Sequence, residues 1–315
     1  MLTKQIKQNT PNQNFPEKIE HFSFVHNLGE FGKDSSFHFA LYRDTEGNEY
    51  VCKLFKGKKN SLKYRSIKNE ISAYKALNQS SPTLQSPLGF EISIPKIYST
   101  YENDEIVCFI MDKVSGNSLD NESIDRIIQS YQAIAEYLLK FSIEADLSKT
   151  GVLRRNFIQF FLLYHYYCLR VILKNPELIL KIINTIPVFY RGIINFSIDR
   201  TNTLVIRDLA SNNNIFIDNK KLLIIDLESA TITHPIIQLS SFVVVESANK
   251  DFLSNFCNSE IAKTIMENHR NLLIFKAMLV YGAMVDIVAN YMADKDPVKE
   301  SSVNLINETF KLKLS

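Results

Sequence analysis

The chain has 315 residues, with 36 Lys and Arg against 34 Asp and Glu, so its formal net charge is only +2. Hydrophobic residues make up 45% of the sequence and charged residues 22%, a balance typical of a globular chain with two domains or one large bilobal domain. This charge balance excludes a general binder of polyanions, although a local basic patch remains compatible with it, and we expect no nucleic-acid partner.

Cysteine and histidine spacing indicates neither a zinc site nor a disulfide framework. The six histidines form no HExxH pattern, and the cysteines form no CxxC pair. The four cysteines lie far apart in the chain, at Cys52, Cys108, Cys168 and Cys257. We therefore expect a reducing, cytoplasmic location. The polar residues 1–20 lack the apolar core of a secretory signal.

The most membrane-like stretch is 157–173. It contains Gln159, His165 and Arg170, and it is shorter than the roughly 20 apolar residues of a transmembrane span. We therefore expect no transmembrane segment here. A buried helix is the favoured interpretation, and a helix at a membrane surface is the alternative.

The first third of the chain predicts a loose or partly docked tail over 1–20 and then an antiparallel sheet. Apolar runs separated by turn residues predict three strands, FSFVHNL, SFHFALYRD and EYVCKLF. Apolar residues then recur at helical spacing over 66–77. Two further strand candidates follow, EISIPKIYSTY and EIVCFIMDKV.

After Ser115-Gly116-Asn117 the pattern becomes helical. We predict helices over 124–141, 154–174 and 176–186, and again from about 259 to 292. Short strand-like runs lie between them, at TLVI, NIFID and KLLIID. The predicted units are therefore a tail (1–20), a β-rich part (21–115) and a mostly helical part (116–315).

Residues that suit nucleotide chemistry occur in the β-rich part. Gly29 and Gly32 lie between two predicted strands and would let the backbone approach phosphate oxygens, although such a pair is by itself typical of an ordinary hairpin turn. Lys53 lies in the third strand and Glu70 on the following helix. These two would form an ion pair facing the phosphates, unless both are solvated surface charges.

The segment IRDLASNNNIFIDNKKLLIIDLESA carries two carboxylates and an amide at the ends of predicted strands. Asp208 follows TLVI, and Asp226 follows LLII. Asp and Asn oxygens suit Mg²⁺, and a carboxylate can accept a proton from an attacking hydroxyl. Spacing from both aspartates favours Asn213 as the amide, whereas the apolar register of the next strand favours Asn214.

This order of motifs, over about residues 22–230, resembles the protein-kinase-like superfamily, nearest to its aminoglycoside phosphotransferases, choline kinases and lipopolysaccharide core kinases. VCK is similar to the family's VAIK strand, IRDLASNN to its HRDLxxxxN loop, and IIDLES to its DFG element. FIMDKVSGNSL is similar to the hinge that holds adenine. Ile206 and Leu227 replace the family's His and Phe, and the glycine loop lacks a third glycine.

The resemblance implies an α+β bilobal fold, with an antiparallel N-lobe and a mainly helical C-lobe that carries a helical insertion. It implies ATP and Mg²⁺ as cofactors, Asp208 as the catalytic base, and Asn213 and Asp226 as metal ligands. In the hinge, Met111 would stand at the gatekeeper position. The nucleotide-binding residues that it implies are Gly29, Gly32, Lys53, Glu70, and the backbone groups of Asp112 and Val114.

The acceptor is expected to be a hydroxyl of a small molecule or saccharide. The interval from the hinge to Asp208 is longer than in typical protein kinases, and no APE-like motif follows Asp226. A protein kinase is the alternative, favoured by the tyrosine-kinase-like Asp-Leu-Ala, with Thr231 and Thr233 as candidate phosphosites or ordinary surface threonines. A pseudokinase scaffold is a third, weaker alternative. The oligomeric state cannot be read from the sequence.

Aromatic residues are concentrated at 157–168 and 189–197. They would either line an acceptor pocket or pack within a helical core, and the helical spacing favours core packing.

Overall fold

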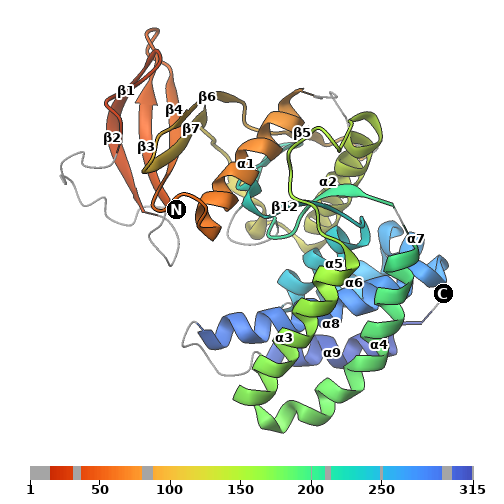
Figure 1. The fold of residues 1–315 in the computed structure, drawn as a ribbon. Coiled ribbons are helices and arrows are strands. Elements are labelled where there is room, and N and C mark those ends of the chain that lie inside the picture. The colour runs from red at the N-terminus through yellow and green to blue at the C-terminus, as the bar shows by residue number, and fades with distance from the viewer. Residues whose placement is uncertain are drawn as a thin grey trace.

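The computed structural model describes residues 15–30, 37–79, 88–199, 201–209, 214–248, 251–292 and 300–313. The β-rich N-terminal part lies at the upper left of Figure 1, and helices make up most of the remainder. The change of composition near residue 116 corresponds to this change of architecture. The exact unit boundaries stay a prediction.

The N-terminal part is a six-stranded antiparallel sheet with the strand order β1-β2-β3-β4-β7-β6. Its strands are β1 (Lys18–Ile19), β2 (Phe22–Glu30), β3 (Phe37–Arg43), β4 (Glu49–Lys56), β6 (Ile97–Glu102) and β7 (Ile106–Asp112). These confirm the predicted strands, except that EISIPKIYSTY divides into β5 (Glu91–Ser93) and β6. The run divides at Pro95, because proline cannot donate a hydrogen bond to a strand ladder.

The last residues of the predicted tail belong to this sheet. β1 pairs with β2, and the side chains of Phe15 and Ile19 are buried. They pack in one core with Cys52 and Cys108, two free thiols that are distant in sequence and share a face of neighbouring strands. Residues 15–19 therefore confirm the partly docked alternative for the tail, because two large apolar side chains anchor them.

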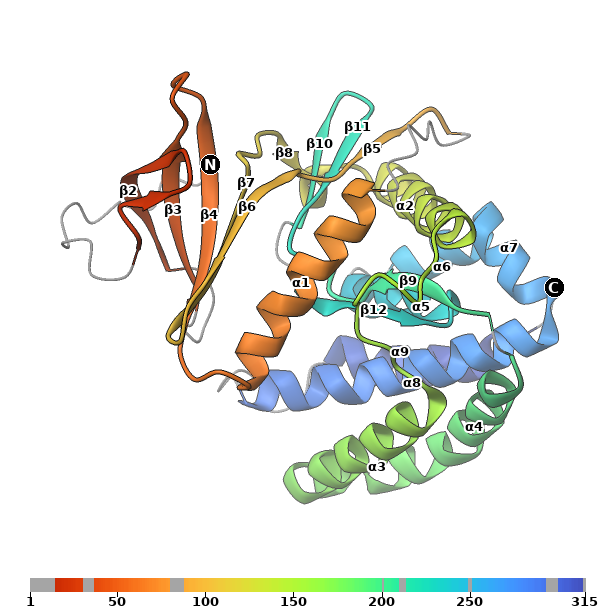
Figure 2. The same ribbon diagram turned by 45° about the horizontal axis from the view of Figure 1, so that its top comes forward.

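Helix α1 (Leu62–Gln79) crosses between the N-terminal sheet and the rest of the molecule (Figure 2). Its apolar residues pack against both sides, since Ile67, Tyr74 and Leu77 are fully buried. Two polar residues of the same helix, Asn69 and Glu70, are buried with them. The helix is thus longer than the 66–77 repeat predicted and carries polar groups into the interior.

Two small sheets follow, with the orders β5-β11-β10-β8 and β12-β9. They confirm the three short strand predictions, whereas β12 was not predicted. Their strands are β8 (Asn117–Ser118), β9 (Thr203–Ile206), β10 (Ile215–Asp218), β11 (Lys221–Ile224) and β12 (Ala230–Thr233).

The helical part contains α2 (Ile124–Glu144), α3 (Phe157–Lys174), α4 (Ile179–Ile198), α5 (Ile236–Val245), α6 (Phe252–Asn258), α7 (Glu260–Glu267), α8 (His269–Met292) and α9 (Glu300–Lys311). The predicted helix end at residue 186 is wrong, because α4 continues through Pro187. Phe189, Ile193 and Phe196 beyond the proline are buried in the core. Their packing offsets the backbone hydrogen bond that the proline removes.

Helix α8 is the central helix, in contact with α3, α4, α5, α7 and α9. Within the described residues it provides the one stretch, His269–Ala289, that is long and apolar enough to cross a membrane. Most of this stretch is buried inside the protein. Its apolar character is therefore explained by its position in the core.

Helices α3 and α4 form a hairpin that projects below the other helices in Figure 2. The favoured interpretation of 157–173 as a buried helix holds for one side of α3 only, where Phe160, Tyr164 and Val171 are buried. The opposite side is exposed. The aromatic runs serve mainly as packing: the rings of Tyr164 and Phe189 stack with their centroids 3.7 Å apart.

Candidate active site

Lys53 is a buried cation between two carboxylates. Its side chain in β4 is almost inaccessible, and its Nζ lies 2.8 Å from Oε2 of Glu70 on α1 and 2.7 Å from Oδ1 of Asp226. The alternative that Lys53 and Glu70 are solvated surface charges is therefore wrong. Three segments that are far apart in the sequence bring their charges to one point.

The sheet register explains why Lys53 points inward. Lys53 pairs with Phe39 across β3 and β4 and with Phe109 across β4 and β7. Its Nζ also lies 4.8 Å from the ring centroid of Phe37, a cation–π distance. Aromatic rings therefore surround the ammonium and exclude water from one side of it, which leaves the carboxylates as its partners.

Asp226 has a left-handed backbone, with φ +58° and ψ +65°. This conformation costs free energy for a residue with a side chain and is concentrated at functional sites. The main-chain N–H of Asp226 donates to the hydroxyl of the buried Tyr74 at 3.1 Å. The backbone at the end of β11 is thus held in a shape that presents the carboxylate to Lys53.

Three carboxylates gather around the Lys53 ammonium, and Lys63 also attracts one of them, Glu228. One oxygen each of Glu70, Asp226 and Glu228 lies within 4.8 Å of the others. Burial, together with the charges of Asp226 and Glu228, raises the pKa of Glu70 to about 7 despite the opposing effect of Lys53. Burial and then Asp226 likewise raise the pKa of Glu228. Burial alone would lower the pKa of Lys53, but the attraction of Glu70 and Asp226 raises it above its ordinary value.

The donor set fits a divalent cation. Three carboxylates outnumber the lysines that act on them, Lys53 and Lys63, and Oε1 of Glu70 is buried with no hydrogen-bond partner among the described residues. Carboxylate oxygens are the ligands that Mg²⁺ prefers. Asp226 and Glu228 are therefore able to hold such an ion beside Lys53.

Asp208 lies against the same turn. Its main-chain N–H donates to the hydroxyl of Ser229 at 3.0 Å, three residues after Asp226. The side-chain amide of Asn214 donates to the carbonyl of Asp208 at 3.0 Å, and the carbonyl of Asn214 accepts from the N–H of Ile225 at 2.9 Å. Asn214 therefore lies between the two aspartates. Asn213 lies outside the described residues.

Asn69 was missed by the sequence analysis. Its amide donates to the carbonyls of Glu228 at 3.2 Å and Ala230 at 2.7 Å, and its Oδ1 accepts from the N–H of Leu153 at 2.8 Å. It ties α1, and with it Glu70, to the turn after Asp226. Its sequence signal is a polar residue on the buried side of the helix, directly before Glu70.

The glycine loop and the hinge are described in part. Gly29 has φ +102° at an irregularity of β2, where the N–H donates to Oδ1 of Asn27, and Gly32 lies outside the described residues. The Asp112 carboxylate accepts from the N–H of Lys96 at 2.7 Å and from the hydroxyl of Tyr98 at 2.9 Å. The hinge is thus anchored to the start of β6 through Asp112, and Val114 follows it, half-buried.

Two arginines on the helical side of Asp208 were also not singled out from the sequence. Burial, followed by repulsion from Arg207, lowers the pKa of Arg155. Tyr281 interacts electrostatically with both arginines and with Asp208. Nε of Arg207 is buried with no hydrogen-bond partner among the described residues. Arg155 thus interacts electrostatically both with Arg207 and with the candidate base Asp208.

No protein-family model matches the sequence, and no curated protein sequence matches it. Solved structures nevertheless share the fold. The structure of aminoglycoside phosphotransferase APH(4)-Ia is 12% identical, with a TM-score of 0.54 over 92% of this chain and 94% of that one. The amicoumacin kinase hAmiN, in complex with AMP-PNP, Ca²⁺ and Ami, is 14% identical, with a TM-score of 0.52 over 93% of this chain and 88% of that one.

These similarities confirm the fold class. The chain has the α+β bilobal fold of the protein-kinase-like small-molecule kinases, with an antiparallel N-lobe and a mainly helical C-lobe. A ternary complex of a thermostable APH(4)-Ia mutant with AMP-PNP and hygromycin B is similar to the same extent, with a TM-score of 0.52 at 12% identity over 92% of this chain and 94% of that one.

Proposed function

We propose that this protein is a phosphotransferase that moves the γ-phosphate of ATP to a hydroxyl of a small molecule or saccharide. The observation that carries the proposal is the buried Lys53 between Glu70 and Asp226, in a fold shared with small-molecule kinases. A buried ammonium facing an excess of carboxylates is suited to an ATP–metal complex, because it can bind phosphate while the carboxylates hold the metal.

Each residue has a role that follows from its position. Lys53, oriented by Glu70, binds the α and β phosphates, and Asp226 with Asn214 would hold Mg²⁺, with Glu228 beside them. Bound Mg²⁺ supplies neutralisation of the negative charge on the phosphates. The carbonyl of Asp112 and the N–H of Val114 are the hinge groups proposed for the adenine edge.

Asp208 is proposed to orient the acceptor hydroxyl and to take its proton. The acceptor oxygen forms a bond to the γ-phosphorus, the bond from that phosphorus to the β–γ bridging oxygen breaks, and the hydroxyl proton passes to the Asp208 carboxylate. The hydrogen bond that the Asp208 N–H donates to Ser229 and the one that its carbonyl accepts from Asn214 hold the backbone on both sides of Asp208. They therefore fix the position of the base relative to Asp226.

The protein-kinase alternative finds less support in the segment that follows Asp226. That segment passes directly through a short 3-10 turn (Leu227–Ser229) into β12 and then α5. Thr231 and Thr233 are buried in β12, and Thr231 donates to the carbonyl of Leu153. They are therefore not surface threonines, and they are not accessible phosphosites.

The arginines beside Asp208 favour an acceptor that carries a negative charge, such as a phosphate or carboxylate group near the reacting hydroxyl. Burial and repulsion from Arg207 lower the pKa of Arg155 although Asp208 opposes them, and an anionic group of the acceptor would place a further negative charge beside the two guanidinium groups. A cationic aminoglycoside would be repelled by the same pair. An anionic sugar or polyol is thus the acceptor class that we propose.

Thermal-shift measurements with AMP-PNP and Mg²⁺ test the nucleotide site. We expect stabilisation of the wild type, retained in Asp208→Asn and lost in Asp226→Asn. Formation of ADP from ATP in the presence of an acceptor should fall by at least about a thousandfold in Asp208→Asn. Absence of any shift in the wild type would favour the pseudokinase alternative.

The acceptor class is tested with a panel of neutral sugars, sugar phosphates, sugar acids and hygromycin B. We expect turnover with anionic members, and a raised KM for them in Arg155→Gln and Arg207→Gln with the KM for ATP unchanged. Lys149→Gln, an exposed cation on the surface, is the control. Preferential turnover of hygromycin B would contradict the anionic acceptor and leave the phosphotransferase proposal intact.

A further inference from the structure

The α3–α4 hairpin exposes an unusual amount of apolar surface. Of the 22 large apolar side chains that are exposed in the described part of the chain, 13 lie on these two helices. Prominent members are Ile158, Leu162 and Leu169 on α3, and Ile179, Ile183 and Ile194 on α4.

These side chains form one face. On α3 they recur at 158, 162, 169 and 173, and on α4 at 179, 183, 186, 190 and 194, so each helix carries a stripe at helical spacing. The stripes meet where Nε2 of His165 lies 3.0 Å from the hydroxyl of Tyr190. We call this surface the hairpin face.

The opposite side of the hairpin is firmly packed. Tyr164 and Phe189 stack between the helices, and a Cβ placed at Gly192 would lie 2.3 Å from Cβ of Ala277 on α8. The exposed stripes therefore cannot turn inward without disrupting this packing. Thirteen half-exposed side chains present on the order of 1,000 Å² of apolar surface, more than the roughly 300–600 Å² of the largest patch on a typical monomer.

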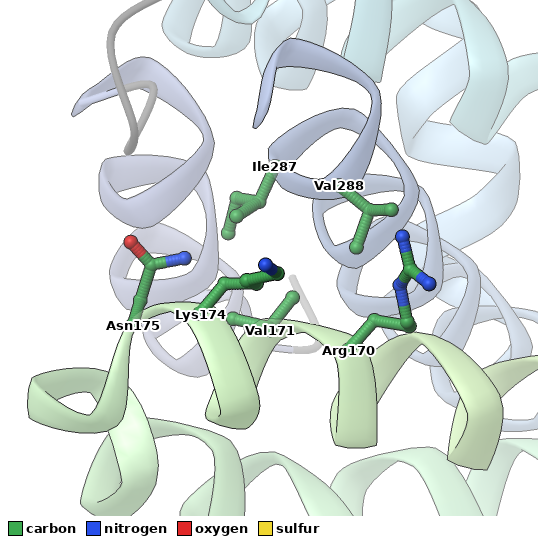
Figure 3. Close-up of a pocket in the computed structure, with 6 residues that line it drawn as sticks. All are labelled: Arg170, Val171, Lys174, Asn175, Ile287 and Val288. Carbon is green, nitrogen blue, oxygen red and sulfur yellow. The ribbon is translucent and has the colours of Figure 1, made fainter. Parts of the chain in front are cut away.

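Positive charge accompanies this apolar surface. Residues 157–198, which span the two helices, contain four Lys and Arg and one acidic residue, Glu177, although the whole chain is nearly neutral. On α4, Arg191 is exposed beside the apolar stripe, whereas Lys181 is exposed on the other side of the helix. On α3, Arg170 and Lys174 lie on the flank that faces α8 (Figure 3).

The pocket in Figure 3 does not itself explain these cations. It is bordered by Val171, Asn175 and the two basic side chains on one side and by Ile287 and Val288 of α8 on the other. Its volume of about 10 Å³ holds at most one water molecule. The basic residues are thus placed at the border of an exposed apolar face, not around a ligand cavity.

We propose that the hairpin face binds the surface of a lipid bilayer that contains anionic headgroups. Apolar side chains with tyrosines among them, flanked by Lys and Arg, are the combination that enters a membrane interface and attracts anionic lipid. A second copy of this chain would bring two positively charged hairpins together. The anionic lipid surface complements both the apolar character and the charge of the face.

Tryptophan fluorescence gives a site-specific test, because the chain contains no tryptophan. Leu169→Trp places the probe on the hairpin face, where Leu169 is 56% exposed, and Leu62→Trp places it on α1, where Leu62 is 84% exposed. With vesicles of phosphatidylcholine and about a quarter phosphatidylserine, we expect a blue shift and quenching by brominated lipid for Leu169→Trp only. Absence of a shift, or an equal shift in both variants, would overturn the proposal.

Vesicle sedimentation of the full chain separates the contribution of the apolar side chains to membrane binding from that of the basic side chains. Leu162→Gln with Leu169→Gln should lower partitioning by about tenfold or more, whereas the matched pair Leu62→Gln with Ile143→Gln, also highly exposed, should leave it unchanged. Arg170→Gln with Arg191→Gln, the two arginines that border the hairpin face, should lower binding by about tenfold or more on anionic vesicles only. Lys59→Gln with Lys113→Gln, on the N-lobe, is the charge control.

Self-association is the competing explanation for the face, and light scattering distinguishes it. A dimer in the absence of lipid that Leu162→Gln with Leu169→Gln dissociates would assign the face to a second copy and contradict the membrane proposal. A monomer that partitions onto anionic vesicles supports it. Neither readout requires kinase activity, so failure of the proposed function leaves this test unaffected.

Discussion

The side-chain amide of Asn214 donates to the main-chain carbonyl of Asp208 at 3.0 Å, and the Asn214 carbonyl accepts from Ile225, the residue before Asp226. Asn214 therefore connects the loop of the candidate base to the strand that carries the candidate metal ligand. Because the amide nitrogen is engaged with Asp208, the amide oxygen is the atom available to a cation. This geometry favours Asn214 over Asn213 as the second ligand.

Replacement of Asn214 by Ala is expected to weaken the apparent affinity for Mg²⁺ by about 10–100-fold, because the loss removes both a ligand oxygen and the bond that holds Asp208. Turnover measured as a function of Mg²⁺ concentration checks this. Asn213→Ala is the matched control and should behave nearly as the wild type. The reverse pattern would assign the ligand to Asn213.

The run Asn212-Asn213-Asn214 shows which site residues can be predicted from the sequence and which cannot. The spacing of the motifs predicts Lys53, Glu70, Asp208 and Asp226, because each has a characteristic residue type in a strand or helix with a clear pattern. The spacing from Asp208 and Asp226 alone favours Asn213 as the metal-binding amide. The apolar register of the following strand, β10 (Ile215–Asp218), placed Asn214 directly before it, and the structure pairs that strand with β11 in this register.

Contacts between distant segments could not be predicted in the same way. Asn69 binds carbonyls more than 150 positions away, and the main-chain N–H of Arg155 donates to the carbonyl of Ile232 in β12, which pairs with β9. No local pattern encodes such pairings. Likewise α4 continues through Pro187 because of tertiary packing, which overrides the local preference to end a helix there.

Lys53 and Glu70 are expected to depend on each other for stability. Lys53→Met leaves buried carboxylates without their cation and should destabilise the protein by about 3–5 kcal/mol. The double variant Lys53→Met with Glu70→Leu should recover part of this loss, because it removes the unpaired charge, and should remain inactive. Urea unfolding of the wild type, both single variants and the double variant checks the coupling. A double variant less stable than Lys53→Met would contradict it.

His234 should make stability depend on pH. Burial lowers its pKa below the ordinary value, although Asp199, 3.4 Å away, opposes this, and its Nδ1 accepts from the N–H of Ile236. The unfolded chain therefore binds a proton more readily than the folded one. The stabilisation is fully present above about pH 6.5 and is lost as the pH falls toward the lower folded-state pKa.

The check for His234 is urea unfolding at about pH 7.5 and about pH 5.5. His234→Gln, which is neutral at both values and able to accept from Ile236, should lose less stability on acidification than the wild type. His269→Gln, an exposed histidine at the start of α8, is the control and should follow the wild type. Equal losses in wild type and His234→Gln would remove His234 as the cause.

Gly192 is expected to control how closely α4 approaches α8. A Cβ at this position would lie 2.3 Å from Cβ of Ala277 and 2.4 Å from the carbonyl oxygen of Leu273, so the backbones would have to separate. Gly192→Ala should therefore destabilise the protein by about 1–3 kcal/mol, although alanine favours a helix over glycine by about 1 kcal/mol. Thermal unfolding checks this, with Asn184→Ala at an exposed position of α4 as the control. A more stable Gly192→Ala variant would show that helix propensity, and not the close crossing, governs this position.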